Sequence, residues 1–165
     1  MNRLVNAALI ALGVACTYPP SLVAQQKPQA PSAPQGQRIS VCSLLPKEEV
    51  KKHIPWLPLL DSMKPEEEPI GTSGSSCNYP SVHIQVLPFT DRFLETARKK
   101  GGLETVAGVG DEAYFHNNRD RYAELYVRVG RHMLTLQANV PNDGKIESVK
   151  PGVLSLAKAL VAKLS

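Results

Sequence analysis

Residues 122–140, YAELYVRVGRHMLTLQANV, decide the fold of this chain. Apolar and polar residues alternate on both sides of Gly130-Arg131, which is the pattern of half-buried β-strands. A two-residue connection that begins with glycine is typical of a type II′ hairpin turn. With the turn placed there, the apolar positions of the two strands face each other. The pairs on this face are Val129 with His132, Val127 with Leu134, Leu125 with Leu136, and Ala123 with Ala138.

The other face of the predicted hairpin carries larger and more polar side chains. Its cross-strand pairs are Arg128 with Met133, Tyr126 with Thr135, and Glu124 with Gln137. A slip of one residue would turn every apolar side chain to the wrong face. The pattern therefore predicts the register as well as the hairpin.

A third strand is predicted just before the hairpin. Residues 111–116 place Ala113 and Phe115 on one face, and the following NNRD has turn chemistry, so a meander is expected over residues 111–140. The run GVGDEAYF at residues 108–115 leads into this strand. A phosphate-binding glycine loop would lead into a helix N-terminus instead. We therefore interpret the run as a turn that starts a strand.

The remaining patterns predict an α+β fold. Residues 82–86 alternate as a strand, while residues 43–54 and 91–100 have helix start and stop signals. The apolar stripe of a C-terminal helix contains Ile146, Val149, Val153, Leu156, Leu160 and Leu164. Pro151 either kinks this helix or begins it. We expect an antiparallel sheet of about five strands with two or three helices, including this amphipathic one, and no clear element over residues 55–75.

The N-terminal part predicts export. Residues 1–24 have the charged, apolar and small-residue order of a signal peptide, and the apolar run is shorter than the roughly 20 residues that span a bilayer. Residues 25–38 form a Pro/Gln-rich linker, and residues 39–165 a single domain. We expect a periplasmic or extracellular protein without a transmembrane span in the mature chain. The alternative is a lipid anchor on Cys16, although Gly13 stands where such sites usually carry an aliphatic residue.

The cysteines agree with an exported chain. With Cys16 inside the signal peptide, Cys42 and Cys77 remain as a pair, and an oxidising compartment favours a disulfide between them. The loop-closure entropy of such a bridge stabilises the folded state by roughly 4 kcal/mol. A metal site or a reactive thiol is the alternative, but the chain has no CxxC and no tight Cys/His spacing.

A set of short motifs resembles a known family. The motifs are Cys42-Ser43-Leu44-Leu45, Glu49-Val50, Cys77-Asn78-Tyr79, the run VGDEAY at 109–114, and the run LYVRVG at 125–130. Together with an amphipathic C-terminal helix, this order is similar to a family of small exported proteins and lipoproteins that share a domain of unknown function. The resemblance covers residues 39–165 and implies an α+β fold similar to PsbP-like domains. It implies no activity and no catalytic residue.

No catalytic motif stands out in the sequence. Residues 71–75 lack the last glycine of G-x-S-x-G, neither HExxH nor a P-loop occurs, and the four histidines are scattered, so we expect no metal and no cofactor. A shared metal site would need His83 and His116 on facing positions. The net charge of +4 is spread out, and the dense basic run Arg98-Lys99-Lys100 suits a helix C-terminus better than nucleic acid.

The sequence therefore favours a non-enzymatic binding or accessory module for a small ligand or an envelope protein. The candidate binding residues are Trp56, in a proline-rich loop, and Tyr114, Tyr122 and Tyr126 on the polar side of the meander. Each has a structural alternative, since Trp56 can pack under its loop and the tyrosines under a helix. The alternative function is a periplasmic hydrolase or metal-dependent enzyme without a recognisable motif.

Overall fold

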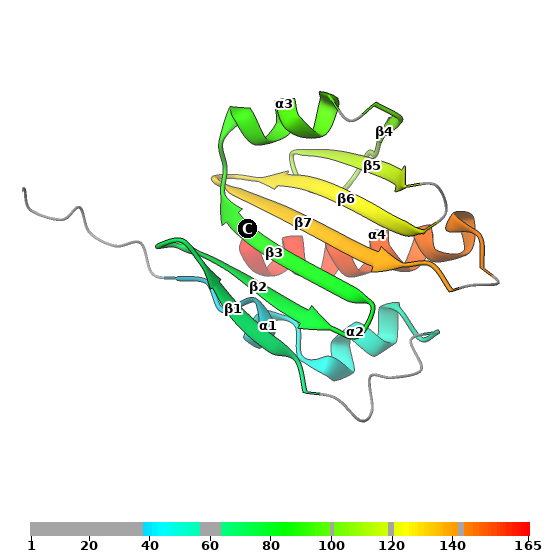
Figure 1. The fold of residues 1–165 in the computed structure, drawn as a ribbon. Helices are drawn as coiled ribbons and strands as arrows, with labels where there is room; N and C mark the ends of the chain where they lie inside the picture. The colour runs from blue at the N-terminus through cyan, green and yellow to red at the C-terminus, as the bar shows by residue number, and fades with distance from the viewer. Residues whose placement is uncertain (1–37, 57–63, 100, 119–120, 142–143) are drawn as a thin grey trace, which may run out of the picture. The chain divides into compact units, whose positions relative to one another are not determined.

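The computed structural model describes residues 38–56, 64–99, 101–118, 121–141 and 144–165. These residues all belong to one compact unit of the chain, Ala33–Ser165. The predicted signal peptide, almost all of the predicted linker and the possible lipidation site Cys16 lie outside the described residues. Figure 1 shows the ribbon. In chain order the elements are α1 (Val41–Leu44), α2 (Lys47–His53), β1 (Glu66–Ile70), β2 (Gly74–Tyr79), β3 (Val82–Pro88), α3 (Asp91–Lys99), β4 (Leu103–Thr105), β5 (Glu112–Asn118), β6 (Tyr122–Val129), β7 (His132–Asn139) and α4 (Ile146–Leu164).

The strands of the described residues form one antiparallel sheet of seven strands in the order β1-β2-β3-β7-β6-β5-β4. The α+β class and the meander are confirmed, but the expected number of about five strands is wrong. The strands that were not located in the sequence are β1 and β4 at the sheet edges and β2 between β1 and β3. The prediction of no clear element over residues 55–75 is corrected by β1 and by the start of β2, while residues 57–63 lie outside the described part.

The predicted hairpin is confirmed in its register. Val127 pairs with Leu134, Leu125 with Leu136, and Glu124 with Gln137. Gly130 has a φ of +55°, the left-handed conformation that the first position of this turn needs and that glycine adopts without strain.

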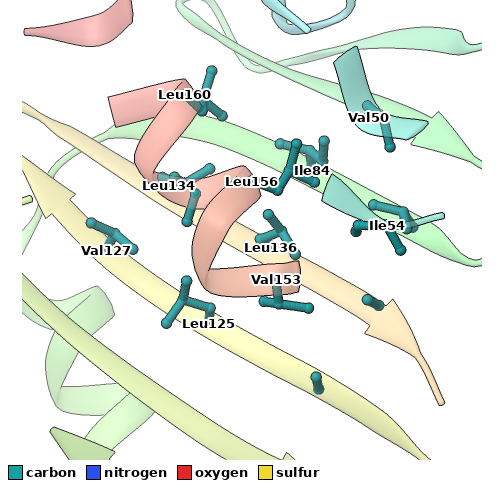
Figure 2. Packing of buried hydrophobic residues seen from close by; sticks show 14 of the residues in the cluster. Val50, Ile54, Ile84, Leu125, Val127, Leu134, Leu136, Val153, Leu156 and Leu160 are labelled. Atoms are coloured by element: carbon teal, nitrogen blue, oxygen red, sulfur yellow. The ribbon is translucent and has the colours of Figure 1, made fainter. Parts of the chain in front are cut away.

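The two faces of the sheet are covered differently. The apolar face packs against α4, whose buried side chains Val153, Leu156 and Leu160 lie over Leu125, Leu134 and Leu136 in Figure 2. Val50 of α2 and Ile54, directly after its end, join the same core. On the opposite face, Leu94 and Ala97 of α3 form a second, smaller cluster with Tyr126 and Met133. The helix α3 therefore covers only part of this second face.

The observed bounds of α1, α2 and α4 differ in detail from the predicted helices. The expected helix over residues 43–54 is two short helices, since Leu45 and Pro46 separate α1 from α2. Proline lacks an N–H, so Pro46 fits before the first turn of α2 but would remove a hydrogen bond from one helix running through both segments. The C-terminal helix begins at Ile146 and contains Pro151, so it does not begin at the proline.

The predicted disulfide between Cys42 and Cys77 is confirmed, with the two Cα atoms 5.1 Å apart. It joins α1 to β2. Beside it, the Ser75 hydroxyl donates a hydrogen bond to the carbonyl of Ile39 at 2.5 Å and accepts one from the Val41 N–H at 3.3 Å. The first described residues are therefore fixed to the interior strand β2 by the disulfide bond and by the two hydrogen bonds of the Ser75 hydroxyl.

The run GVGDEAYF is a turn, as predicted. Gly108 and Gly110 have φ values of +73° and +60°, and the strand β5 begins at Glu112. The Asp111 carboxylate accepts a hydrogen bond of 2.7 Å from the backbone N–H of Gly130, and its own N–H donates to the Arg128 carbonyl at 2.9 Å. The turn thus ties β5 to the hairpin turn.

Candidate functional site

A cleft lies between α3 and the face of the sheet that α4 does not cover. Its volume is about 470 Å³, within the range of small-molecule sites. The sheet supplies the floor and α3 the wall. The described residues that line the cleft are His83, Gln85, Thr90, Arg92, Phe93, Thr96, Ala97, Glu124, Tyr126, Thr135 and Gln137.

The floor is built from two rows of paired residues that cross the strands. Because side chains alternate between the faces of a sheet, residues paired across neighbouring strands line up on the same side. The first row is Asn78, His83, Gln137, Glu124 and His116. The second row is Ser76, Gln85, Thr135, Tyr126 and Tyr114. Five adjacent strands therefore present polar side chains on one face of the sheet. The opposite face of the same strands packs in the apolar core.

Glu124 lies at the centre of this floor and is only 7% exposed. Its Oε2 accepts a hydrogen bond of 2.8 Å from the Tyr126 hydroxyl and lies 3.0 Å from Nδ1 of His116. A buried carboxylate needs such partners, because an uncompensated charge is costly away from water. The network holds Glu124 and Tyr126 in fixed positions on the cleft floor.

Thr135 has an unusual environment in the same floor. Three buried side-chain atoms have no hydrogen-bond partner within the described residues, namely Trp56 Nε1, Arg128 Nε and Thr135 Oγ1. Of these residues, only Thr135 lines the cleft. Leaving a buried hydroxyl without a partner costs about 1–3 kcal/mol. Thr135 thus has a buried hydroxyl without a partner among the described residues, in a residue that lines the cleft floor.

Contacts at both ends of α3, the helix that forms the wall of the cleft, hold it against the sheet. The rings of Phe93 and Tyr126 meet edge to face with their centroids 6.3 Å apart. At the other end of the helix, the Arg98 guanidinium donates to Glu112 at 2.6 Å and to the Tyr114 hydroxyl at 3.0 Å. The hydrogen bond from Tyr114, aided by Arg98, holds the pKa of Glu112 below its ordinary value. These contacts fix the width of the cleft.

His83 is the histidine of the first row that lines the cleft. Its Nδ1 is hydrogen-bonded to the side-chain oxygen of Asn78, which can only accept, so the neutral ring keeps Nε2 as an acceptor. Burial lowers the pKa of His83 below 6.5, and the nearby Glu68 carboxylate opposes this only in part. His83 is therefore neutral at pH 7 and can accept a hydrogen bond from a ligand.

This burial predicts a pH dependence of stability. Because the pKa of His83 is lower in the folded than in the unfolded chain, the unfolded chain binds a proton first as the pH falls through 6.5. The free energy of unfolding should therefore decrease toward acidic pH, and His83→Gln should reduce that decrease. Urea unfolding at several pH values between about 8 and 5 measures it.

His132, whose pKa burial also lowers with help from Arg131, should contribute with the same sign. His132→Gln is thus the companion variant. If the wild type and His83→Gln lost stability in parallel over the whole range, the assigned environment of His83 would be contradicted.

The structure separates the residues that the sequence proposed for binding. Tyr126 lines the cleft, and Tyr114 is paired with it on the neighbouring strand and held by Arg98. Tyr122 is on the same face, at the end of β6 opposite Asn139. Trp56 packs elsewhere, against the α4-side core, where a Cβ on Gly152 would come within 2.6 Å of its ring. The structure therefore brings Tyr114 and Tyr126 together and leaves Trp56 apart from them.

Several cleft residues were not proposed from the sequence, among them His83, Gln85, Glu124, Thr135 and Gln137. Their signal was present in the hairpin, where Glu124 and Gln137 pair on the face opposite the core. A polar strand face usually indicates solvent. Only the position of α3 over this face makes it a cleft, and no local pattern predicts that position.

A serine, a histidine and a glutamate also meet at α2 and α4. His53 Nδ1 lies 2.8 Å from the Ser155 hydroxyl, and its Nε2 lies 3.3 Å from Glu49, which also binds Lys52 at 2.9 Å. The arrangement of Ser155, His53 and Glu49, with the histidine between the other two, resembles the catalytic triad of a hydrolase. However, Ser155 lies well inside α4, where backbone N–H groups donate within the helix and are not available to an oxyanion. We therefore interpret the cluster as a clip between α2 and α4.

The described part of the chain also bears on a metal site and on a membrane-spanning helix. There, no group of three or more His, Cys, Asp or Glu side chains is arranged to hold a metal ion. His83 and His116 lie on one face but are separated by Gln137 and Glu124. Within the same residues, no helix combines the length and the apolar character needed to cross a membrane.

Comparisons of the chain with protein-family models, with curated proteins and with solved structures found no match. The geometry of the cleft therefore carries the functional argument.

Proposed function

We propose that this chain is a non-enzymatic binding module that holds a small polar molecule in the cleft beneath α3. The observation that carries the proposal is the buried Thr135 hydroxyl, which lines the cleft and has no partner among the described residues. Proteins rarely leave a buried polar atom without a partner, so each exception needs an explanation, such as a bound water, a bound ion or a functional role. A ligand hydroxyl or carbonyl would complete its hydrogen bonding.

The surroundings of Thr135 support a binding role. Gln85 and Gln137 flank it on the floor, and each amide carries both donors and an acceptor. Phe93 and Ala97 add an apolar wall. A few polar groups beside an apolar surface, held by rigid strands, are typical of small-molecule sites. The strands β3, β6 and β7 are interior to the sheet, so their side chains are held firmly.

We further propose that the module acts outside the cytoplasm, in the periplasm or extracellular space. The disulfide between Cys42 and Cys77 supports this, because such bonds persist in oxidising compartments. The signal-peptide pattern of residues 1–24 agrees with it. A lipid anchor on Cys16 is the alternative mode of retention at the envelope.

Replacing Thr135 by valine tests the proposed function. The substitution keeps the shape of the side chain but removes the unpartnered hydroxyl, so the free protein should be as stable as wild type or more stable by about 1 kcal/mol. The same change should abolish most of the stabilisation by a bound ligand. Thermal unfolding of both proteins, with and without a panel of saccharides, amino acids, carboxylates and nucleosides, measures both effects.

Thr105→Val is the matched control, because Thr105 is an exposed threonine of β4 that does not line the cleft. It should keep the full ligand-induced shift of the unfolding temperature. The proposal is contradicted if no compound of the panel stabilises the wild type, or if Thr135→Val responds to the stabilising compound as the wild type does.

A further inference from the structure

A second cavity adjoins the cleft on the same face of the sheet. It has a volume of about 250 Å³ and lies where β2 turns into β3. Its described lining residues are Asn78, Tyr79, Ser81, Val82, His83, Gln137 and Asn139. His83 and Gln137 line both cavities. The two cavities therefore lie side by side along β3 and β7, and the pair is called the groove below.

The groove is longer than a single small ring. From Gln85 in the first cavity to Val82 in the second, β3 advances three residues, or about 10 Å at about 3.3 Å per strand residue. The two ends also differ, since the first cavity contains Phe93 and Ala97 whereas the second is lined largely by amide and hydroxyl side chains. Such a groove fits a ligand with at least two linked units.

The groove carries little uncompensated charge. Of the described lining residues of both cavities, Arg92 is the one arginine or lysine and Glu124 the one carboxylic acid, and burial keeps His83 neutral at pH 7. Arg92 is exposed at the start of α3, while the Glu124 carboxylate is already bonded to Tyr126 and His116. An anionic ligand would thus meet no lysine or arginine among the described floor residues, and a cationic ligand would compete with Tyr126 and His116 for Glu124. A neutral ligand rich in hydroxyl groups matches the row of amides and hydroxyls instead.

An extended peptide fits the groove less well. Peptides that bind sheets usually do so through their backbone at an open strand edge. The groove lies over β3, β7 and β6, whose backbone groups pair with neighbouring strands on both sides. Only side chains are available to the ligand there, which suits hydroxyl groups on a ring and apolar packing of the ring on Phe93.

We infer that the groove binds a neutral oligosaccharide of two or more sugar units, with one unit beneath α3 and the next beside Asn78 and Asn139. This inference rests on the proposed binding function and names its ligand class. The unit beneath α3 contacts Gln85, Thr135 and Phe93. The next unit contacts Asn139, and Gln137 lies between the two.

Calorimetric titration of the full chain tests the inference. The probes are N-acetylglucosamine and glucose, each as the monomer, the β-1,4-linked dimer and the trimer. For whichever of the two sugars binds, the dimer should bind at least tenfold more tightly than the monomer. Asn139→Ala, at an exposed position, should weaken dimer binding about tenfold and leave monomer binding unchanged, whereas Gln85→Ala should weaken both. Thr105→Ala should change neither.

The possible failures are distinguishable. Equal affinity for monomer and dimer, or an Asn139→Ala variant that binds the dimer like wild type, overturns the elongated site. No heat from either series, while another compound stabilises the protein in a Thr135-dependent way, overturns the saccharide assignment and leaves the proposed function intact. If no compound stabilises the protein at all, the proposed function fails and the inference with it.

Discussion

Replacing both Cys42 and Cys77 by alanine should lower the free energy of unfolding by about 4 kcal/mol. The bond closes a loop with a sequence separation of 35, and opening it returns that loop entropy to the unfolded chain. It also frees α1, which would then depend on the Ser75 hydrogen bonds and on the burial of Val41 and Leu45. Chemical denaturation of the oxidised wild type and the double variant measures the difference.

Reduction of the wild type provides the control for this experiment. A reducing agent should bring the wild type close to the double variant and leave the double variant itself unchanged. If the oxidised wild type and the double variant unfolded at the same denaturant concentration, the bond would not contribute as the structure implies. An effect of reduction on the double variant would point to another thiol.

Replacing Gly110 by alanine should cost about 3 kcal/mol. A side chain at a φ of +60° costs roughly 1–2 kcal/mol, and overpacking adds a similar amount. The overpacking arises because a Cβ at this position would overlap the carbonyl oxygen of Arg128 and come within 2.5 Å of Val127 Cγ1. The neighbouring Asp111 N–H donates to that carbonyl, so the backbone cannot move away without losing a bond. Thermal or urea unfolding measures the loss.

Gly108 offers a matched control two residues away. It has a similar φ of +73°, but a Cβ there would meet nothing within 4 Å. Gly108→Ala should therefore show the conformational cost alone, about 1–2 kcal/mol. Equal losses in the two variants would show that the close approach of Gly110 to β6 has no energetic role.

The sequence predicted the centre of this fold better than its edges. The hairpin β6–β7 was predicted to the residue, because two matching alternations and a Gly-X turn leave only one register. The stripe of α4 was equally clear, although the role of Pro151 was not. The edge strand β1 was missed because its sequence, EEEPI, has no apolar alternation and is almost entirely exposed. Charges and proline are common at sheet edges, where only one side is paired.

The candidate site was predicted only in part. The polar pairing of Glu124 with Gln137 and of Tyr126 with Thr135 followed from the hairpin register. The contribution of β3, through His83 and Gln85, depends on its pairing with β7, which is distant in sequence. The wall depends on the packing of α3 over Tyr126 and Met133. Long-range pairing and helix docking are tertiary effects, so a local pattern could indicate the floor but not the cleft.

The central claim is that the cleft beneath α3 binds a small polar molecule. The most direct measurement is a titration of the ¹⁵N-labelled chain, followed by two-dimensional NMR, with the compound that stabilises it most. The largest shifts should fall on cleft residues of β3, β6, β7 and α3, such as Gln85, Thr135 and Thr96. The amides of α4 on the opposite face should barely change. Shifts centred on α2 and α4, or no shifts at all, would contradict the account.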